Sequence, residues 1–188
     1  GAVAIVVVMA FSVCYRIGER ERNMTKTAQY FVEHLKMNAH PEGGYYVSTY
    51  HSDVPTKTLQ GERPHYTSIY FLLRSQDISH LHRLKSDELW YYHGGSALTV
   101  HMILEDGTYV AKKLGLNIDK GEQPQVLVPK NTIFGSSVDE ENTFSLVGCM
   151  VSPGFDFADF EMFTQAELIE QYPAHEAIIR KMAYEKLD

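Results

Sequence analysis

The chain is poor in cysteine, with only Cys14 and Cys149 in 188 residues. Their separation fits neither a disulfide framework nor a zinc site, so we expect a reducing, cytoplasmic compartment. The chain also shows no internal repeat, no low-complexity linker and no stripe of lysine and arginine. With a formal charge of −7, it is not expected to bind nucleic acid.

Tryptophan is scarce as well, since one Trp stands against 12 Tyr and 9 Phe. Such a mixture is typical of β-strands that carry aromatic walls. The length suits a single domain with a substantial core. We therefore expect one domain over residues 24–188, preceded by an apolar and basic extension over residues 1–23.

Residues 2–15 are almost entirely apolar. The run is shorter than the roughly 18–20 residues of a spanning helix, and it lacks the basic start of a signal peptide. Three interpretations stay open: a truncated membrane anchor, a tail that packs on the domain or a partner, and an extension upstream of a product beginning near Met24. If the run is an anchor, the arginines that follow it leave the domain in the cytoplasm, as the other two interpretations do.

The pattern from residue 45 onward is one strand after another. Asp106-Gly107 is a strong hairpin signal, and Thr164 with Glu167 forms a capping box that starts a helix. Short strands joined by turns predict an antiparallel sandwich or barrel with helices at both ends. Helices are predicted over residues 28–37, from the capping box at Thr164 onward, and over residues 174–187. Strands are predicted over 45–50, 66–73, 79–84, 88–93, 98–104, 108–113, 126–129, 132–136, 144–151 and 157–163.

The residues that carry chemistry lie between His80 and Trp90. Side chains alternate along a strand, so His80 and His82 are expected to point the same way, and Glu88, Trp90 and Tyr92 to share one face. Two imidazoles and a carboxylate form a facial metal triad and are also sufficient for acid–base chemistry. A carboxylate inside a fold is costly unless it is paired or used, which predicts a small-molecule pocket.

Four motifs, in order, resemble the cupin superfamily, and more narrowly an uncharacterised branch of small cupins. The motifs are HPEGGY at 40–45, His82-Arg83 with Asp87-Glu88-Leu89-Trp90, GEQPQ at 121–125, and PGFDFADFE at 153–161. The resemblance implies an all-β fold, the cupin-type double-stranded β-helix or jelly-roll barrel, with short N-terminal and C-terminal helices. It also implies a homodimer.

Cupins take metal ligands from two motifs. His80, His82 and Glu88 fit the first, with one extra residue between His82 and Glu88. Phe134 occupies the place of the histidine that ends the second, and a phenyl ring cannot bind a metal. The cofactor is therefore unknown, and a divalent metal held by His80, His82 and Glu88 stays one alternative.

We predict His82 and Glu88 as catalytic residues. Without a metal, His82 bonded to Glu88 or Asp87 is a base, with Tyr92 or Tyr70 as the acid; this is similar to the sugar-nucleotide epimerases of the cupin fold. The predicted function is proton transfer on a carbohydrate-like or other small polar metabolite. The alternatives are a non-catalytic binding protein and a scaffold dimer. The predicted ligand-binding residues are Glu42, Tyr70, Asp87, Trp90, Tyr92 and Gln125.

Overall fold

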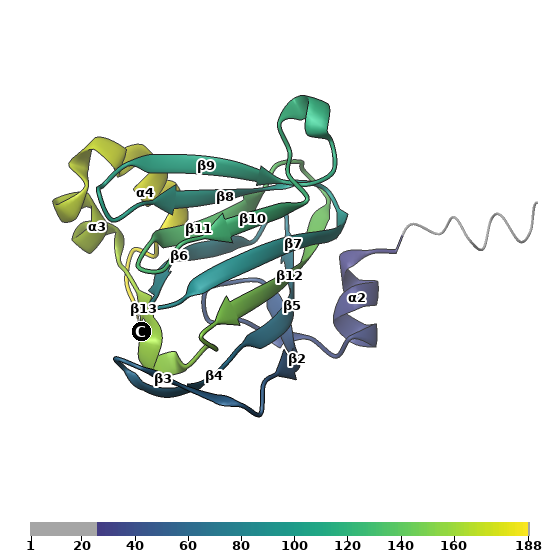
Figure 1. The fold of residues 1–188 in the computed structure, drawn as a ribbon. Coiled ribbons are helices and arrows are strands. Elements are labelled where there is room, and N and C mark those ends of the chain that lie inside the picture. Colours follow the sequence, from purple (N-terminus) through teal and green to yellow (C-terminus); the bar gives the residue numbers. More distant parts are fainter. Residues whose placement is uncertain (1–25, 188) are drawn as a thin grey trace, which may run out of the picture.

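The structure is a computed structural model that describes residues 26–187. Two antiparallel sheets pack against each other (Figure 1), one with the strand order β1-β2-β5-β12-β7-β10 and one with the order β13-β6-β11-β8-β9. Strands distant in sequence are neighbours, because β12 pairs with both β5 and β7. This confirms the all-β jelly-roll architecture, with its described strands in two separate sheets rather than one closed barrel.

The first sheet has six described strands. It consists of β1 (Asn38–Ala39), β2 (Tyr45–His51), β5 (Thr67–Arg74), β12 (Phe144–Ser152), β7 (Asp87–Gly95) and β10 (Gln125–Val128). The second consists of β13 (Phe160–Met162), β6 (Ile78–Leu84), β11 (Ile133–Val138), β8 (Leu98–Ile103) and β9 (Tyr109–Leu114). A separate hairpin pairs β3 (Pro55–Thr58) with β4 (Gly61–Pro64).

The main core lies between the two sheets. Phe71 and Trp90 from the first sheet pack in one cluster with Leu98, Val100 and Phe134 from the second. Each of these five side chains is at most 1% exposed. Burial of a large apolar side chain stabilises the fold by about 1.5–3 kcal/mol, so this interior is the principal source of stability.

The outer faces are covered by helices. Helices α3 (Gln165–Gln171) and α4 (Glu176–Met182) cover the second sheet (Figure 1), where Leu168 and Ile179 pack on Leu81 and Ile133. The capping box of α3 is confirmed by the paired contacts of Thr164 and Glu167. Helix α2 (Ala28–His34) lies against the other sheet, with Phe31 among the residues packed there.

Two helices are shorter than the sequence pattern predicts, since α2 ends at His34 and α4 at Met182. The predicted strand 157–163 is instead a 3-10 turn, Phe157–Asp159, followed by the short strand β13. The hairpin of β3 and β4 was not predicted, because its polar sequence lacks the alternation of a half-buried strand.

Within residues 26–187, no helix has both the length and the apolar character needed to cross a bilayer. The predicted extension over residues 1–23, including the proposed membrane contact of residues 2–15, lies outside the described residues.

Candidate functional site

A cavity of about 490 Å³ lies between the two sheets. Its walls are mostly apolar, and their aromatic members include Tyr46, Phe71, Trp90, Phe155 and Phe160. A small number of polar groups converge inside: His40, Glu42, His82 and Glu88. An apolar cavity with a few convergent polar groups is the usual form of a small-molecule site.

Glu42 reaches the cavity from the turn between β1 and β2. Gly43 and Gly44 have φ values of 113° and 74°, in the region that favours glycine. A Cβ at Gly43 would collide with the backbone oxygen of Ile78, so the turn lies directly on β6. The Glu42 carbonyl accepts hydrogen bonds from the backbone N–H of His80 at 2.8 Å and from His80 Nδ1 at 2.7 Å.

The carboxyl group of Glu42 is the centre of the polar cluster. Its Oε2 lies 3.2 Å from His82 Nε2 and 3.5 Å from His40 Nδ1, and its Oε1 accepts a hydrogen bond from Ser79 Oγ at 2.8 Å. Glu42 is 6% exposed. Burial raises the pKa of this carboxyl above its ordinary value, which favours the protonated form.

The hydrogen bonds of His82 determine where a proton must lie. His82 Nδ1 lies 2.7 Å from the carbonyl oxygen of His80, which can only accept, so Nδ1 carries a hydrogen. Burial lowers the pKa of His82 to about 4, so the ring is neutral near pH 7 and its Nε2 is a bare lone pair. The contact between Nε2 and Glu42 Oε2 therefore holds one proton, and that proton belongs to the Glu42 carboxyl.

His40 supports the same assignment. The backbone N–H of Glu42 donates to His40 Nδ1 at 3.3 Å, which makes this nitrogen an acceptor. Burial lowers the pKa of His40, so its ring is also neutral. His40 therefore has no hydrogen to give to Glu42 Oε2, and a proton on Oε2 can donate to His82 Nε2, the nearer of the two nitrogens.

Glu88 is the second carboxyl of the cavity and comes from β7. It is 6% exposed, and its side chain lies beside those of Trp90 and Cys149. Burial raises the pKa of Glu88 to about 8, and the nearby Glu42 adds to the rise. The neighbouring side chains of Trp90 and Cys149 offset part of this rise in the pKa of Glu88. The Trp90 Nε1–H itself has no hydrogen-bond partner among the described residues. Glu88 is therefore a protonated acid near neutral pH.

A β-bulge separates His80 from His82. On β11, Phe134 is opposite His82 but Ser136 is opposite Ser79, so β6 has one extra residue here. Gly135 faces the bulge, and a Cβ there would collide with the Ser79 carbonyl oxygen. The bulge turns Ser79 and His82 toward Glu42, and His80 stacks instead on Tyr184, with 3.6 Å between ring centroids. The expected common direction of His80 and His82 is therefore not found.

The residues do not fit the metal that the cupin resemblance implies. Among residues 26–187, no three His, Cys, Asp or Glu side chains are grouped so that they could hold a metal ion. His80 does not line the cavity, while His82 and Glu88 do. Phe134 occupies the place where the cupin resemblance implies a further ligand, and its ring centroid lies 4.1 Å from that of His82.

Of the predicted site residues on β7, two line the cavity and two do not. Glu88 and Trp90 line the cavity, as their shared strand face predicts. Tyr92 packs at the margin of the same core, but its hydroxyl donates to the Gly95 carbonyl and it does not line the cavity. Asp87 is exposed, and its Oδ1 accepts from a backbone N–H at 2.7 Å.

Two other predicted ligand-binding residues lie elsewhere. Tyr70 is adjacent to Phe71 on β5 and therefore faces the opposite side of the sheet, where it packs in the cluster beneath α2. Gln125 is exposed on β10, opposite Tyr91. Neither lines the cavity, so their predicted contact with a ligand has no support from the geometry.

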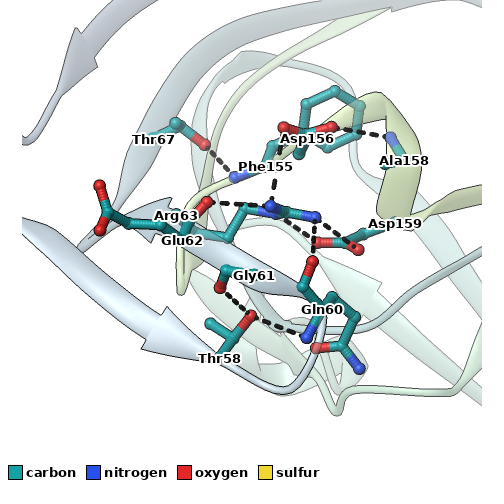
Figure 2. Close-up of polar contacts among 10 residues, drawn as sticks. All are labelled: Thr58, Gln60, Gly61, Glu62, Arg63, Thr67, Phe155, Asp156, Ala158 and Asp159. Carbon is teal, nitrogen blue, oxygen red and sulfur yellow. Dashed lines mark hydrogen bonds and ion pairs between the residues drawn. The ribbon is translucent and has the colours of Figure 1, made fainter.

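Sequence reasoning missed part of the aromatic wall, which belongs to the 153–161 motif. Figure 2 shows why this segment is held in place: Arg63 of β4 donates to both oxygens of Asp159, at 2.8 and 3.0 Å. The Phe155 backbone N–H donates to Thr67 Oγ1 at 2.9 Å. These contacts keep Phe155 and Phe160 at the cavity, so this motif is both a structural bend and a wall.

The jelly roll and its enclosed polar cluster define the protein as a cupin. A family model described as Cupin superfamily (DUF985) matches residues 29–163, and the chain belongs to this family.

Solved structures agree with this assignment. A hypothetical protein from Leishmania major is 46% identical, covering 85% of this chain and 99% of its own, with a TM-score of 0.82. A crystal structure of a protein from Shewanella oneidensis is also 46% identical, covering 86% of this chain and 100% of its own, with a TM-score of 0.81. A mutant of Bacillus subtilis oxalate decarboxylase shares the fold at 16% identity, covering 80% of this chain and 38% of its own, with a TM-score of 0.51. No curated protein matches the chain.

Proposed function

We propose that this cupin binds a small polar metabolite in the cavity and moves a proton on it. The observation that carries the proposal is the 3.2 Å contact of Glu42 Oε2 with His82 Nε2, beside a second buried carboxyl, Glu88. Acids and bases whose pKa values are shifted by burial, gathered in one cavity, are the usual equipment of proton-transfer catalysis. Carbohydrate-like metabolites, which isomerise or epimerise by such steps, are one class of substrate.

The proposed step conserves protons. The Glu42 proton passes to His82 Nε2, and the carboxylate that forms takes a proton from an acidic C–H of the ligand. Glu88 donates its own proton to the ligand, at the oxygen or carbon where negative charge develops. The product is an isomer of the substrate. Glu42 keeps the proton taken from the ligand, His82 releases its added proton to solvent, and Glu88 takes one proton from solvent, which restores the site.

The test is exchange with heavy water. Metabolite mixtures are incubated in D₂O with the wild-type protein, with Glu42→Gln, and with Glu170→Gln, an exposed control on α3, and are then analysed by mass spectrometry. We expect a metabolite that gains deuterium with the wild type and the control but not with Glu42→Gln. Equal labelling by Glu42→Gln would overturn the proposal.

A non-catalytic binding protein is the second candidate. The aromatic residues of the wall favour it, because such residues bind a ligand without any chemical change. Saturable binding of a metabolite that stays unlabelled in D₂O would identify this function. The predicted scaffold role of the domain is a third alternative, which binding of any ligand in the cavity would disfavour.

The oligomeric state and the cellular compartment of the protein are also part of the proposal. A homodimer in the cytoplasm is the expected state, and no nucleic acid is expected as a partner. Light scattering of the purified full chain tests the dimer directly, and fractionation of cells that produce the full chain tests the compartment.

A further inference from the structure

Within residues 26–187, the cavity offers no lysine or arginine to a ligand. Its ionisable lining groups include Glu42, Glu88, His40, His82 and the exposed His51, and no Lys or Arg of the described chain lines it. Burial lowers the pKa of His40 and of His82, so these two rings are neutral near pH 7. An anion that enters must lose its hydration without gaining a cationic partner, and this is strongly unfavourable.

The same cavity has two buried carboxyls with no described Lys or Arg beside them. Glu88 is 6% exposed, and the Trp90 and Cys149 side chains beside it are uncharged. Glu42 lies within electrostatic reach of Glu88. An ammonium group placed between the two carboxyls would favour the carboxylate form over the protonated form that burial favours, and its N–H groups would donate to both.

The wall suits a cation for a second reason. Phe71 and Trp90 meet edge to face with 5.8 Å between ring centroids, and Phe155 and Phe160 do so at 5.9 Å. Such packing presents ring faces as well as edges to the cavity that these rings line. Aromatic faces attract a cation that has left water, and aromatic rings also pack well on a flat ligand body.

We propose that the ligand of this cavity carries a protonated amine on an apolar, flat body, with the amine at Glu88 and Glu42 and the body between Phe71, Trp90 and Phe160. The inference rests on the proposed small-molecule site and goes beyond it by naming the charge of the ligand. It disfavours sugar nucleotides and carboxylic acids, because their negative charge has no partner in the described lining.

The test is calorimetric titration of the full chain with three compounds that share a phenyl ring: phenethylamine, phenethyl alcohol and hydrocinnamate. We expect the amine to bind at least about tenfold more tightly than the alcohol, as expected for a charge interaction away from water, and the carboxylate not to bind. Glu88→Gln should remove most of the advantage of the amine over the alcohol, and Glu170→Gln should keep it.

The wild-type series alone can overturn the inference. Equal or tighter binding of the alcohol or the carboxylate contradicts it, and so does the absence of binding by all three. Neither result touches the proton-transfer proposal, which is decided by the deuterium experiment. If Glu88→Gln does not fold, Glu42→Gln supplies the comparison, because Glu42 also faces the amine.

Discussion

Glu42 Oε2 and His82 Nε2 lie 3.2 Å apart inside the cavity, on two residues that are 6% and 2% exposed. Because His82 Nδ1 donates to a carbonyl, the two groups share a single proton. The turn before β2 and the bulge in β6 together create this contact, which neither segment forms alone.

Glu42→Gln should preserve the fold and remove proton transfer. The amide can donate to His82 Nε2 and accept from Ser79 Oγ, so we expect the free energy of unfolding to change by no more than about 1 kcal/mol. Glu42→Ala leaves two buried polar groups without a partner and should cost about 1–3 kcal/mol for each. Urea denaturation of the two variants measures the difference. Equal destabilisation by both would show that the Glu42 hydrogen bonds do not matter for stability.

Glu88 should make the protein less stable as the pH rises. Its pKa is 4.5 in the unfolded chain and about 8 in the folded one, so between these values the folded state holds a proton that the unfolded state has lost. The stabilisation is therefore complete below 4.5 and is lost as the pH rises through 8. Near pH 8, Glu88→Gln should be more stable than the wild type by an amount on the order of a few kcal/mol.

Urea denaturation at a series of pH values measures this slope. The histidines and Glu42 titrate in both proteins, so the difference between the two curves reports Glu88 together with its effect on the neighbouring Glu42. Parallel curves for the wild type and Glu88→Gln would contradict a raised pKa for this carboxyl.

The bulge in β6 depends on the absence of a side chain at Gly135. Because an added Cβ would meet the Ser79 carbonyl, Gly135→Ala should destabilise the fold by about 1–3 kcal/mol and displace His82. Gly94→Ala is the matched control, since a Cβ there has nothing within 4 Å and Gly94 is not among the glycines with positive φ. It should be neutral to within about 0.5 kcal/mol. Thermal unfolding measures the stability of both variants. Equal destabilisation by the two substitutions would contradict the special requirement for glycine at position 135.

The contact of Arg63 with Asp159 should hold the aromatic wall in place. Arg63→Met removes both hydrogen bonds to Asp159, so amide hydrogen exchange in residues 153–161 should accelerate. Arg180→Met is the control, because the pair of Arg180 with Glu176 is exposed and contributes little. Mass spectrometry of peptides gives the readout. Unchanged exchange in 153–161 for Arg63→Met would mean that the wall is held by packing alone.

Local sequence signals predicted much of the fold. The Asp106-Gly107 turn, the Thr164 capping box and the alternation that places Glu88 with Trp90 each depend on residues near one another in the chain. The family motifs identified the jelly roll, and they included Glu42 among the site residues. These features were accessible because their physical cause is local or repeats along the chain.

The remainder of the site depends on contacts between distant segments. Nothing within His80-Leu81-His82 indicates a bulge, and Gly135, which accommodates it, lies on another strand. The pairing of Arg63 with Asp159 likewise joins a polar hairpin to a distant turn. Alternation along a strand is reliable only while the register is regular, and for this reason the two histidines diverge.

The most direct test of the shared proton is nitrogen-15 NMR of the His82 ring across a pH titration. We predict that Nδ1 stays protonated, that Nε2 shows the shift of a hydrogen-bond acceptor, and that the ring gains no charge until the pH approaches 4. In Glu42→Ala, the Nε2 signal should lose the effect of that hydrogen bond. A protonated Nε2 with a bare Nδ1, or a ring that titrates at its ordinary pKa of 6.5, would contradict the proton assignment and the acid–base site built on it.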